Sequence, residues 1–252
     1  MNYNWHWKVL LETEPGGSGT YLHYLIVGLG WTLATALAAW VIALAIGALV
    51  GTLRTTPLKW VVRLGNLYVE IFRNVPLIVQ MFLWFFVVPE LLPKGLGDWI
   101  KQMPPPWSSY LPAVLCLGVF TSVRVAEQVR AGINSLPRGQ RMAGIATGLT
   151  ETQTYRYVIL PQAFRIILPP LTSEFMNVIK NSSVALTIGL LELTGRARAM
   201  QEFSFRVFEA FATATVIYLL TNLIVVLAMR ALERKVRVPG LIAVSGAPQA
   251  GH

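Results

Sequence analysis

Three groups of polar side chains lie within apolar stretches of this 252-residue chain, and their spacing places each group on one helix face. Glu70, Arg73 and Asn74 stand at positions i, i+3 and i+4, and Arg124 and Glu127 repeat the i, i+3 spacing. Side chains so spaced can form an ion pair within one helix, or they can border a path for a charged molecule. Both interpretations stay open for both groups.

The third group is a polar stripe around residue 180. At about 100° per residue, six positions fall within an arc of roughly 120°. They are Ser173, Glu174, Asn177, Lys180, Asn181 and Val184. A polar stripe on a membrane helix faces protein or water. Because Lys180 has no acidic residue one turn away, the stripe favours the lining of a translocation path over simple helix packing.

The sequence contains no group of residues typical of an enzyme active site. The histidines His6, His23 and His252 are scattered, and Cys116, the single cysteine, sits in an apolar run without a nearby histidine base. The sequence also lacks a G-x-x-x-x-G-K-[ST] phosphate loop. We therefore expect no catalytic residue, no metal and no cofactor in this chain.

Composition indicates a membrane protein. Apolar residues make up 54% of the chain, and the mean hydropathy is +0.55. A soluble domain of this length cannot bury so many apolar residues in one core. The net charge of +9 is typical of a membrane protein whose cytoplasmic loops are rich in Lys and Arg. The sequence has no basic run interleaved with aromatic residues, so nucleic-acid binding is not favoured. The N-terminus lacks the basic-then-apolar layout of a cleaved signal.

A hydrocarbon core about 30 Å thick needs roughly 20 apolar residues per helix, and about five stretches qualify. The predicted spans are residues 24–53, 68–88, 111–128, 165–191 and 211–232. Small residues recur every fourth position along the first span, which predicts a close approach of another helix. They are Thr35, Ala39, Ala43, Gly47 and Gly51.

The positive-inside rule orients these spans. Cations gather between spans one and two, between three and four, and after five, which places the N-terminus outside and the C-terminus in the cytoplasm. Arg196, Arg198 and Arg206 disagree, because they fall in a loop that this topology puts outside. We expect one transmembrane domain over 1–237 with a cytoplasmic loop at 129–164, and a disordered tail at 238–252.

The cytoplasmic loop contains a polar, helix-like stretch, GIATGLTETQTYRYVILPQA, at 144–163. Gly144 and Gly148 mark points of close approach. Apolar contacts of short amphipathic helices would come from Met142, Ile145, Leu149 and Tyr157. Such helices suit docking on a soluble partner, although a loop of this length could also be a solvated connection.

This loop resembles that of the membrane subunits of ABC-type importers for polar amino acids. Their shared motif reads E-A-A, three residues, Gly, nine residues, I-x-L-P; here Met142-Ala143-Gly144, Gly148 and Val158-Ile159-Leu160-Pro161 keep the spacing. Three more blocks are similar: YVEIFRNVPLIVQMF at 68–82, AEQVRAGINSLPRGQ at 126–140 and KNSSVALTIGLLEL at 180–193. Within the family, the likeness is greatest to glutamate/aspartate import permeases.

The resemblance implies an all-α membrane fold of about five helices, the type I importer permease fold, in a bacterial inner membrane. It implies four kinds of partner besides membrane lipid: a second like or identical permease subunit, an ABC ATPase dimer carrying ATP and Mg, an external amino-acid-binding protein, and the amino acid itself. Coupling to the ATPase would involve Gly139, Gln140, Met142, Ala143, Gly144, Gly148, Leu160 and Pro161. Met142 replaces the motif's Glu and so removes an acidic contact.

Relatives of this kind often have Tyr where this chain has Arg124. A guanidinium there favours a substrate with a side-chain carboxylate, together with Lys180 and Arg73, unless Arg124 only pairs with Glu127. Candidates for the substrate path are Arg73, Asn74, Arg124, Glu174, Asn177, Lys180, Asn181, Ser182 and Ser183. The alternatives are an ion-coupled carrier, which commonly carries two internal repeats, and a non-transporting scaffold.

Overall fold

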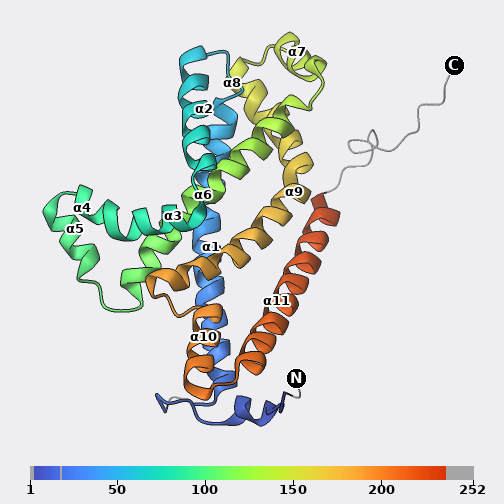
Figure 1. The fold of residues 1–252 in the computed structure, drawn as a ribbon. Helices are drawn as coiled ribbons and strands as arrows, with labels where there is room; N and C mark the ends of the chain where they lie inside the picture. The colour runs from blue at the N-terminus through green and yellow to red at the C-terminus, as the bar shows by residue number, and fades with distance from the viewer. Residues whose placement is uncertain (1–2, 18, 237–252) are drawn as a thin grey trace.

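The structure, a computed structural model, describes residues 3–17 and 19–236, and these residues are helical apart from short connections (Figure 1). The first half contains η1 (Trp7–Leu11), α1 (Tyr21–Leu53), α2 (Lys59–Asn74), α3 (Leu77–Phe82), η2 (Leu83–Val87), α4 (Val88–Leu91), α5 (Lys94–Lys101) and α6 (Trp107–Asn134). The second contains α7 (Arg138–Ala146), α8 (Glu151–Thr154), η3 (Tyr155–Ile159), α9 (Leu160–Asn181), η4 (Ser182–Ile188), α10 (Leu193–Ser204) and α11 (Val207–Val236). The predicted tail at 238–252 lies outside the described residues.

Three helices of the described part are long and apolar enough to cross a membrane, namely α1, α6 and α11. They contain the predicted spans 24–53, 111–128 and 211–232. A fourth crossing is counted only if the bent pair formed by α2 and the segment 77–91 is one span. The all-helical class is therefore confirmed, whereas two of the five predicted spans have a different form.

The second predicted span, 68–88, is not one straight helix. The chain bends by 101° between α2 and the helix that begins at Leu77. The cause is local: Pro76 disfavours the helical conformation for the residue before it, and Val75 is extended at φ −98° and ψ 126°. Gln80 secures the bend, because its Nε2 donates to the carbonyl oxygens of Phe72 at 2.9 Å and Val75 at 3.0 Å. The segment beyond it projects sideways from the other helices (Figure 1).

The fourth predicted span, 165–191, also differs. The helix α9 begins earlier, at Leu160, and ends at Asn181, after which the chain forms the 3-10 helix η4 and a left-handed turn at Gly189, with φ 86°. It follows α8 through the π turn η3 with helical backbone at both junctions. A π turn before Pro161 suits a residue that lacks an N–H and crowds the preceding turn. Helical backbone therefore runs from Glu151 to Asn181.

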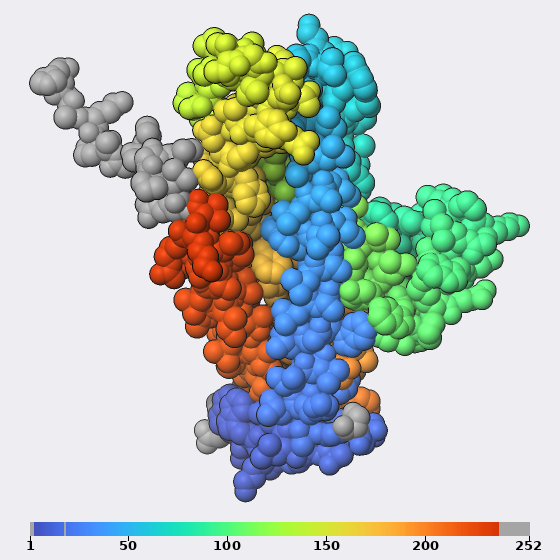
Figure 2. All heavy atoms as spheres, turned by 180° about the vertical axis from the view of Figure 1, so that it is seen from behind, coloured from blue at the N-terminus to red at the C-terminus, as the bar shows by residue number. Residues whose placement is uncertain are grey.

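The most extensive contact between helices joins α1 to α6. All five small residues of the predicted row on α1 are buried, which confirms that expectation. A Cβ atom on Gly47 would lie 2.5 Å from Val125 Cβ, and one on Gly51 would lie 2.7 Å from the carbonyl oxygen of Ala126. Only glycine admits this approach. Figure 2 shows α1 running along the length of the molecule.

At the end opposite α7, the N-terminal segment crosses beneath α1, α10 and α11 (Figure 1). The hydroxyl of Tyr3 and the backbone N–H of His6 donate to the buried carboxylate of Glu209. The three unexpected arginines near this end each have a local partner. Arg196 stacks 4.2 Å from the Tyr24 ring, Arg198 bonds Glu202 at 2.9 Å, and Arg206 donates to the carbonyl of Asn4 at 3.0 Å.

Candidate functional site

A polar cavity of about 530 Å³ lies where α2, α6 and α9 meet. The bend after α2 ends that helix at Asn74, so Arg73 sits in the last helical turn beside the cavity. From α6 come the aromatic ring of Phe120 and the guanidinium of Arg124, and α9 contributes Glu174. The complete lining is Phe72, Arg73, Phe120, Val123, Arg124, Glu127, Gln128 and Glu174.

Arg124 and Glu174 form a loose ion pair across this cavity. The Arg124 Nη1 atom lies 3.6 Å from Glu174 Oε2, which is beyond hydrogen-bond distance. The Arg124 side chain is 45% exposed and that of Glu174 is 14% exposed, and the buried Glu174 Oε2 has no hydrogen-bond partner in the described structure. The guanidinium carbon also lies 5.0 Å from the centre of the Phe120 ring. Arg124 therefore keeps donors that a bound anion could use.

Glu127 does not pair with Arg124, so the intrahelical ion pair, one of the two alternatives for this group, is not formed. Its Oε1 accepts from Arg54 Nη1 at 2.7 Å, while Arg54 Nε donates to Asn66 Oδ1 at 2.8 Å. Arg54 is only 7% exposed. Its two hydrogen bonds connect the end of α1 to α2 and α6. Arg54 is one of the cations between the first two predicted spans, and its position directly after the last turn of α1 gave no sign of a partner 73 residues away.

The ion pair of Glu70 with Arg73, which the sequence allowed, is also not formed. Glu70 instead accepts from Asn74 Nδ2, through its backbone oxygen at 2.7 Å and its Oε2 at 3.3 Å. Within residues 3–17 and 19–236, the ion pairs shorter than 4.0 Å do not include Arg73. Arg73 is thus a cation at the cavity without an internal carboxylate partner.

The polar stripe on α9 points away from the packed side of that helix. Ser173 and Lys180 are exposed, whereas Val178 and Ile179 are buried. Of the stripe, only Glu174 lines the cavity. The remaining path candidates do not line it either: Asn74, Asn177, Lys180, Asn181, Ser182 and Ser183.

The two serines have a structural role in the turn that follows α9. Ser182 is buried and its hydroxyl donates to the carbonyl oxygen of Ile179 at 2.8 Å. The hydroxyl of Ser183 donates to the carbonyl oxygen of Lys180 at 2.7 Å. Both hydroxyls therefore bond the helix backbone one turn earlier.

The helices α7 and α8 form a compact corner at the far end of the molecule. Gly144 is buried, and a Cβ atom there would lie 2.7 Å from Thr154 Cγ2, which confirms a close approach. Gly148 differs: a Cβ atom there would meet nothing within 4 Å, but its φ of +86° favours glycine. Thr150 then caps α8 in a reciprocal capping box with Gln153.

The outer surface of this corner carries apolar side chains. Met142 is 65% exposed, Ile145 45% and Tyr157 62%. Gly139 and Gln140 lie on the exposed first turn of α7, and Ala143 is exposed one turn later. Leu160 is half-buried and Pro161 exposed at the start of α9. An exposed apolar surface on a short amphipathic helix fits contact with another protein.

The sequence matches the family described as binding-protein-dependent transport system inner membrane component over residues 43–238. The chain therefore belongs to this family. It is a multi-pass component of a bacterial inner membrane and moves solute rather than catalysing a reaction. A component of a binding-protein-dependent transport system is the first of the alternatives that the sequence offered, ahead of the ion-coupled carrier and the scaffold.

Among its relatives, the glutamate/aspartate import permease protein GltJ of Escherichia coli K12 is 48% identical over 241 residues, covering 95% of this chain and 98% of the relative. The probable glutamine ABC transporter permease protein GlnM of Bacillus subtilis 168 is 33% identical, covering 79% and 88%. A crystal structure of an amino acid ABC transporter with histidines has a TM-score of 0.72 at 30% identity, covering 85% of this chain and 95% of that one. The methionine ABC transporter MetNI shares the fold, with a TM-score of 0.70 at 21% identity and coverage of 86% and 98%.

Proposed function

We propose that this chain is the permease subunit of an ABC importer for acidic amino acids, and that it forms the translocation path with a second like or identical membrane subunit. The observation that carries the acidic specificity is the pair of arginines at one cavity, Arg73 without an internal carboxylate and Arg124 only loosely paired. The name of the relative that is 48% identical, a glutamate/aspartate import permease, supports the same substrates.

Glu174 acts in this proposal as an internal substitute for the substrate. When the path is empty, its carboxylate neutralises part of the charge of Arg124 at 3.6 Å. A glutamate or aspartate side chain can take a bidentate position on the same guanidinium, which a single 3.6 Å contact does not provide. Glu174 then competes with the substrate and favours its release. High affinity resides on the external binding protein, which delivers the amino acid.

Energy enters through the corner formed by α7 and α8, which docks on a soluble ATPase dimer that holds ATP and Mg. The residues involved are Gly139, Gln140, Met142, Ala143, Gly144, Gly148, Leu160 and Pro161. Because helical backbone continues from Glu151 to Asn181, a displacement of α8 moves α9 and with it Glu174. The same helix thus joins the ATPase contact to the charge in the cavity.

The proposed topology has five membrane spans over residues 1–237, with the N-terminus outside. The straight spans are α1, α6 and α11, the second is bent at Pro76, and the fourth is α9 followed by η4. The corner of α7 and α8 then lies in the cytoplasm with the C-terminal end of α11.

Transport into sealed vesicles tests the function. The subunit is reconstituted with its ATPase and binding-protein partners, and uptake of radiolabelled glutamate, aspartate and glutamine is measured. We expect uptake of the two acidic amino acids to require ATP on the ATPase side and to survive collapse of ion gradients. Uptake that follows an ion gradient, or that prefers glutamine, contradicts the proposal.

A further inference from the structure

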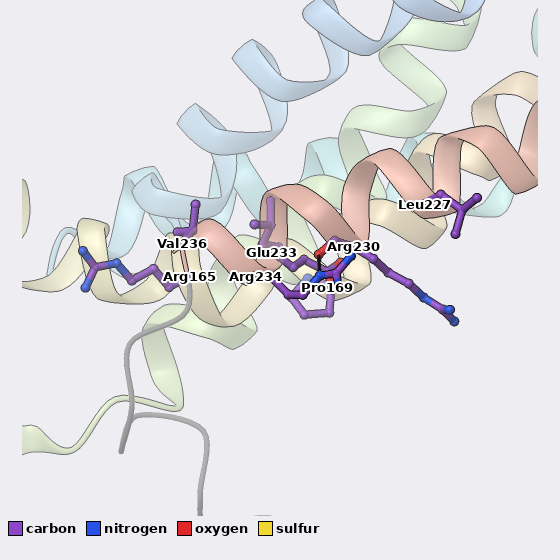
Figure 3. Close-up of a pocket in the computed structure, with 8 residues that line it drawn as sticks. Arg165, Pro169, Leu227, Arg230, Glu233, Arg234 and Val236 are labelled. Atoms are coloured by element: carbon purple, nitrogen blue, oxygen red, sulfur yellow. Dashed lines mark hydrogen bonds between the residues drawn. The ribbon is translucent and has the colours of Figure 1, made fainter.

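A second cavity, of about 510 Å³, lies between α9 and the C-terminal end of α11, apart from the site described above. Figure 3 shows Arg165 and Pro169 on α9 beside residues of the last turns of α11. The lining is Arg165, Leu168, Pro169, Leu227, Arg230, Glu233, Arg234 and Val236, which we call the α9–α11 groove. The transport mechanism proposed above uses none of these side chains.

The charges of the groove are strongly asymmetric. Three guanidinium groups face one carboxylate, and that carboxylate is already engaged, because Glu233 Oε1 accepts from Thr172 Oγ1 at 2.9 Å. Of the arginines, Arg234 donates through Nε to the carbonyl oxygen of Arg230 at 3.3 Å. None of the ion pairs in the described residues includes Arg165, Arg230 or Arg234. The groove therefore attracts an anion.

The arginines are distributed along the groove rather than gathered at one point. In Figure 3 the side chains of Arg165 and Arg230 extend toward opposite ends, with Arg234 between them. This arrangement suits an extended anionic group more than a single small ion. The floor between the charges is apolar and includes the buried Leu168 and the exposed Pro169.

The groove also lies at an abrupt change along α11. Before it, five large apolar side chains are more than half exposed: Leu219, Leu220, Leu223, Ile224 and Leu227. From Arg230 onward the helix carries cations. Such a change from exposed apolar to basic residues is typical of the level at which acyl chains meet headgroups. Leu227 belongs both to the apolar surface and to the groove, so the two are continuous.

We infer that the α9–α11 groove binds an anionic phospholipid, with its headgroup lying among the three arginines and the start of an acyl chain along Leu168, Pro169 and Leu227. The residues 237–252 are a poor alternative occupant, because they contain no Asp or Glu. Since α9 also carries Glu174 and continues into α8, the lipid holds α11 against the helix that moves during coupling. Only this last step rests on the proposed function.

Native mass spectrometry of the detergent-solubilised full chain tests the inference by titration with phosphatidylglycerol and, separately, phosphatidylcholine. We expect a phosphatidylglycerol adduct that phosphatidylcholine does not match. The triple variant Arg165→Gln, Arg230→Gln, Arg234→Gln should weaken it by roughly tenfold or more, given the usual contribution of basic residues near anionic lipid. A control triple, Lys59→Gln, Arg63→Gln, Arg156→Gln, removes the same charge from other exposed positions and should leave binding unchanged.

A variant that is expected to strengthen lipid binding separates loss of the binding site from loss of folding. Glu233→Gln removes the carboxylate charge yet keeps an oxygen for Thr172, so it should tighten phosphatidylglycerol binding several-fold. Equal binding to both lipids, equal loss in the two triple variants, or displacement of the adduct by millimolar inorganic phosphate overturns the inference. So does binding that arises only after residues 237–252 are deleted. Because the readout is lipid retention, these outcomes are independent of whether the chain transports acidic amino acids.

Discussion

Arg124 Nη1 on α6 lies 3.6 Å from Glu174 Oε2 on α9, and this carboxylate oxygen is buried without a hydrogen-bond partner. A buried carboxylate oxygen that lacks donors is costly, and a nearby cation that does not reach hydrogen-bond distance compensates it only in part. The arrangement is therefore suited to exchange: either the helices close until the pair bonds, or a substrate carboxylate takes Glu174's place on Arg124.

Replacing Arg124 by Tyr should weaken the preference for acidic substrates. The variant removes the guanidinium that pairs with a side-chain carboxylate, and charge-assisted hydrogen bonds contribute about 1.5–3 kcal/mol. We expect uptake of glutamate relative to glutamine to fall roughly tenfold or more. Competition between the two radiolabelled amino acids in vesicles measures it. Arg130→Gln is the control, because Arg130 is on the same helix but does not line the cavity. An unchanged preference for glutamate would show that Arg124 does not select acidic substrates.

Replacing Glu174 by Gln should have the opposite effect on binding. The neutral amide no longer competes for Arg124, so the KM for glutamate should fall several-fold while kcat falls as well, because release is slower. Initial rates over a range of glutamate concentrations separate the two parameters. Glu202→Gln is a matched control, since Glu202 forms an exposed pair with Arg198 on α10. A KM that rises or stays constant shows that Glu174 does not compete with the substrate.

Local rules in the sequence were sufficient for part of this fold. The row of small residues on α1 predicted the contact with α6 because a period of four on one helix needs no knowledge of the partner. Hydropathy failed at 68–88 because a window average passes through the bend that Pro76 imposes. The i, i+3 rule likewise failed for Arg124 and Glu127. Arg124 pairs with Glu174 on α9, 50 residues away, and Glu127 pairs with Arg54 just after α1, 73 residues away. The pattern of one helix cannot show such pairing.

Gly148 should tolerate substitution according to backbone conformation rather than size. Its φ of +86° and the open space around its Cα predict that Gly148→Asn is mild and Gly148→Val severe, because Asn enters left-handed conformations far more readily than a β-branched residue. In the severe variant, ATP hydrolysis should continue while uptake falls. The ratio of phosphate released to glutamate imported measures this uncoupling.

Gly95→Val provides the control for added bulk, since Gly95 also has open space but no positive φ. If Gly148→Val transports normally, the corner of α7 and α8 has no part in coupling. If Gly148→Asn is as damaging as Gly148→Val, the surface at this position matters and the backbone conformation does not.

Glu192 should make the stability of the contact between α1, α10 and α11 dependent on pH. Its buried carboxylate caps α10 and accepts from the backbone N–H of Gly195 at 2.7 Å, from Tyr218 at 2.9 Å and from Thr32 at 3.2 Å. Burial raises the pKa of Glu192 above its usual 4.5, against the opposing effect of these donors. The folded protein therefore holds this proton more tightly than the unfolded chain does. The corresponding stabilisation is complete below pH 4.5 and is lost as the pH rises through the folded pKa.

Melting temperatures of the solubilised protein, measured from below pH 4.5 upward, test whether Glu192 causes this pH dependence. Glu192→Gln should melt with a weaker dependence on pH than the native chain above pH 4.5, because its amide does not titrate. Glu192→Ala should lower the free energy of unfolding by about 2–4 kcal/mol below pH 4.5 and by less at higher pH, since it removes the acceptor of buried donors on α1, α10 and α11. Glu202→Gln, an exposed acid on the same helix, should leave the profile unchanged. Parallel profiles for Glu192→Gln and the native chain would show that Glu192 keeps the same protonation state folded and unfolded.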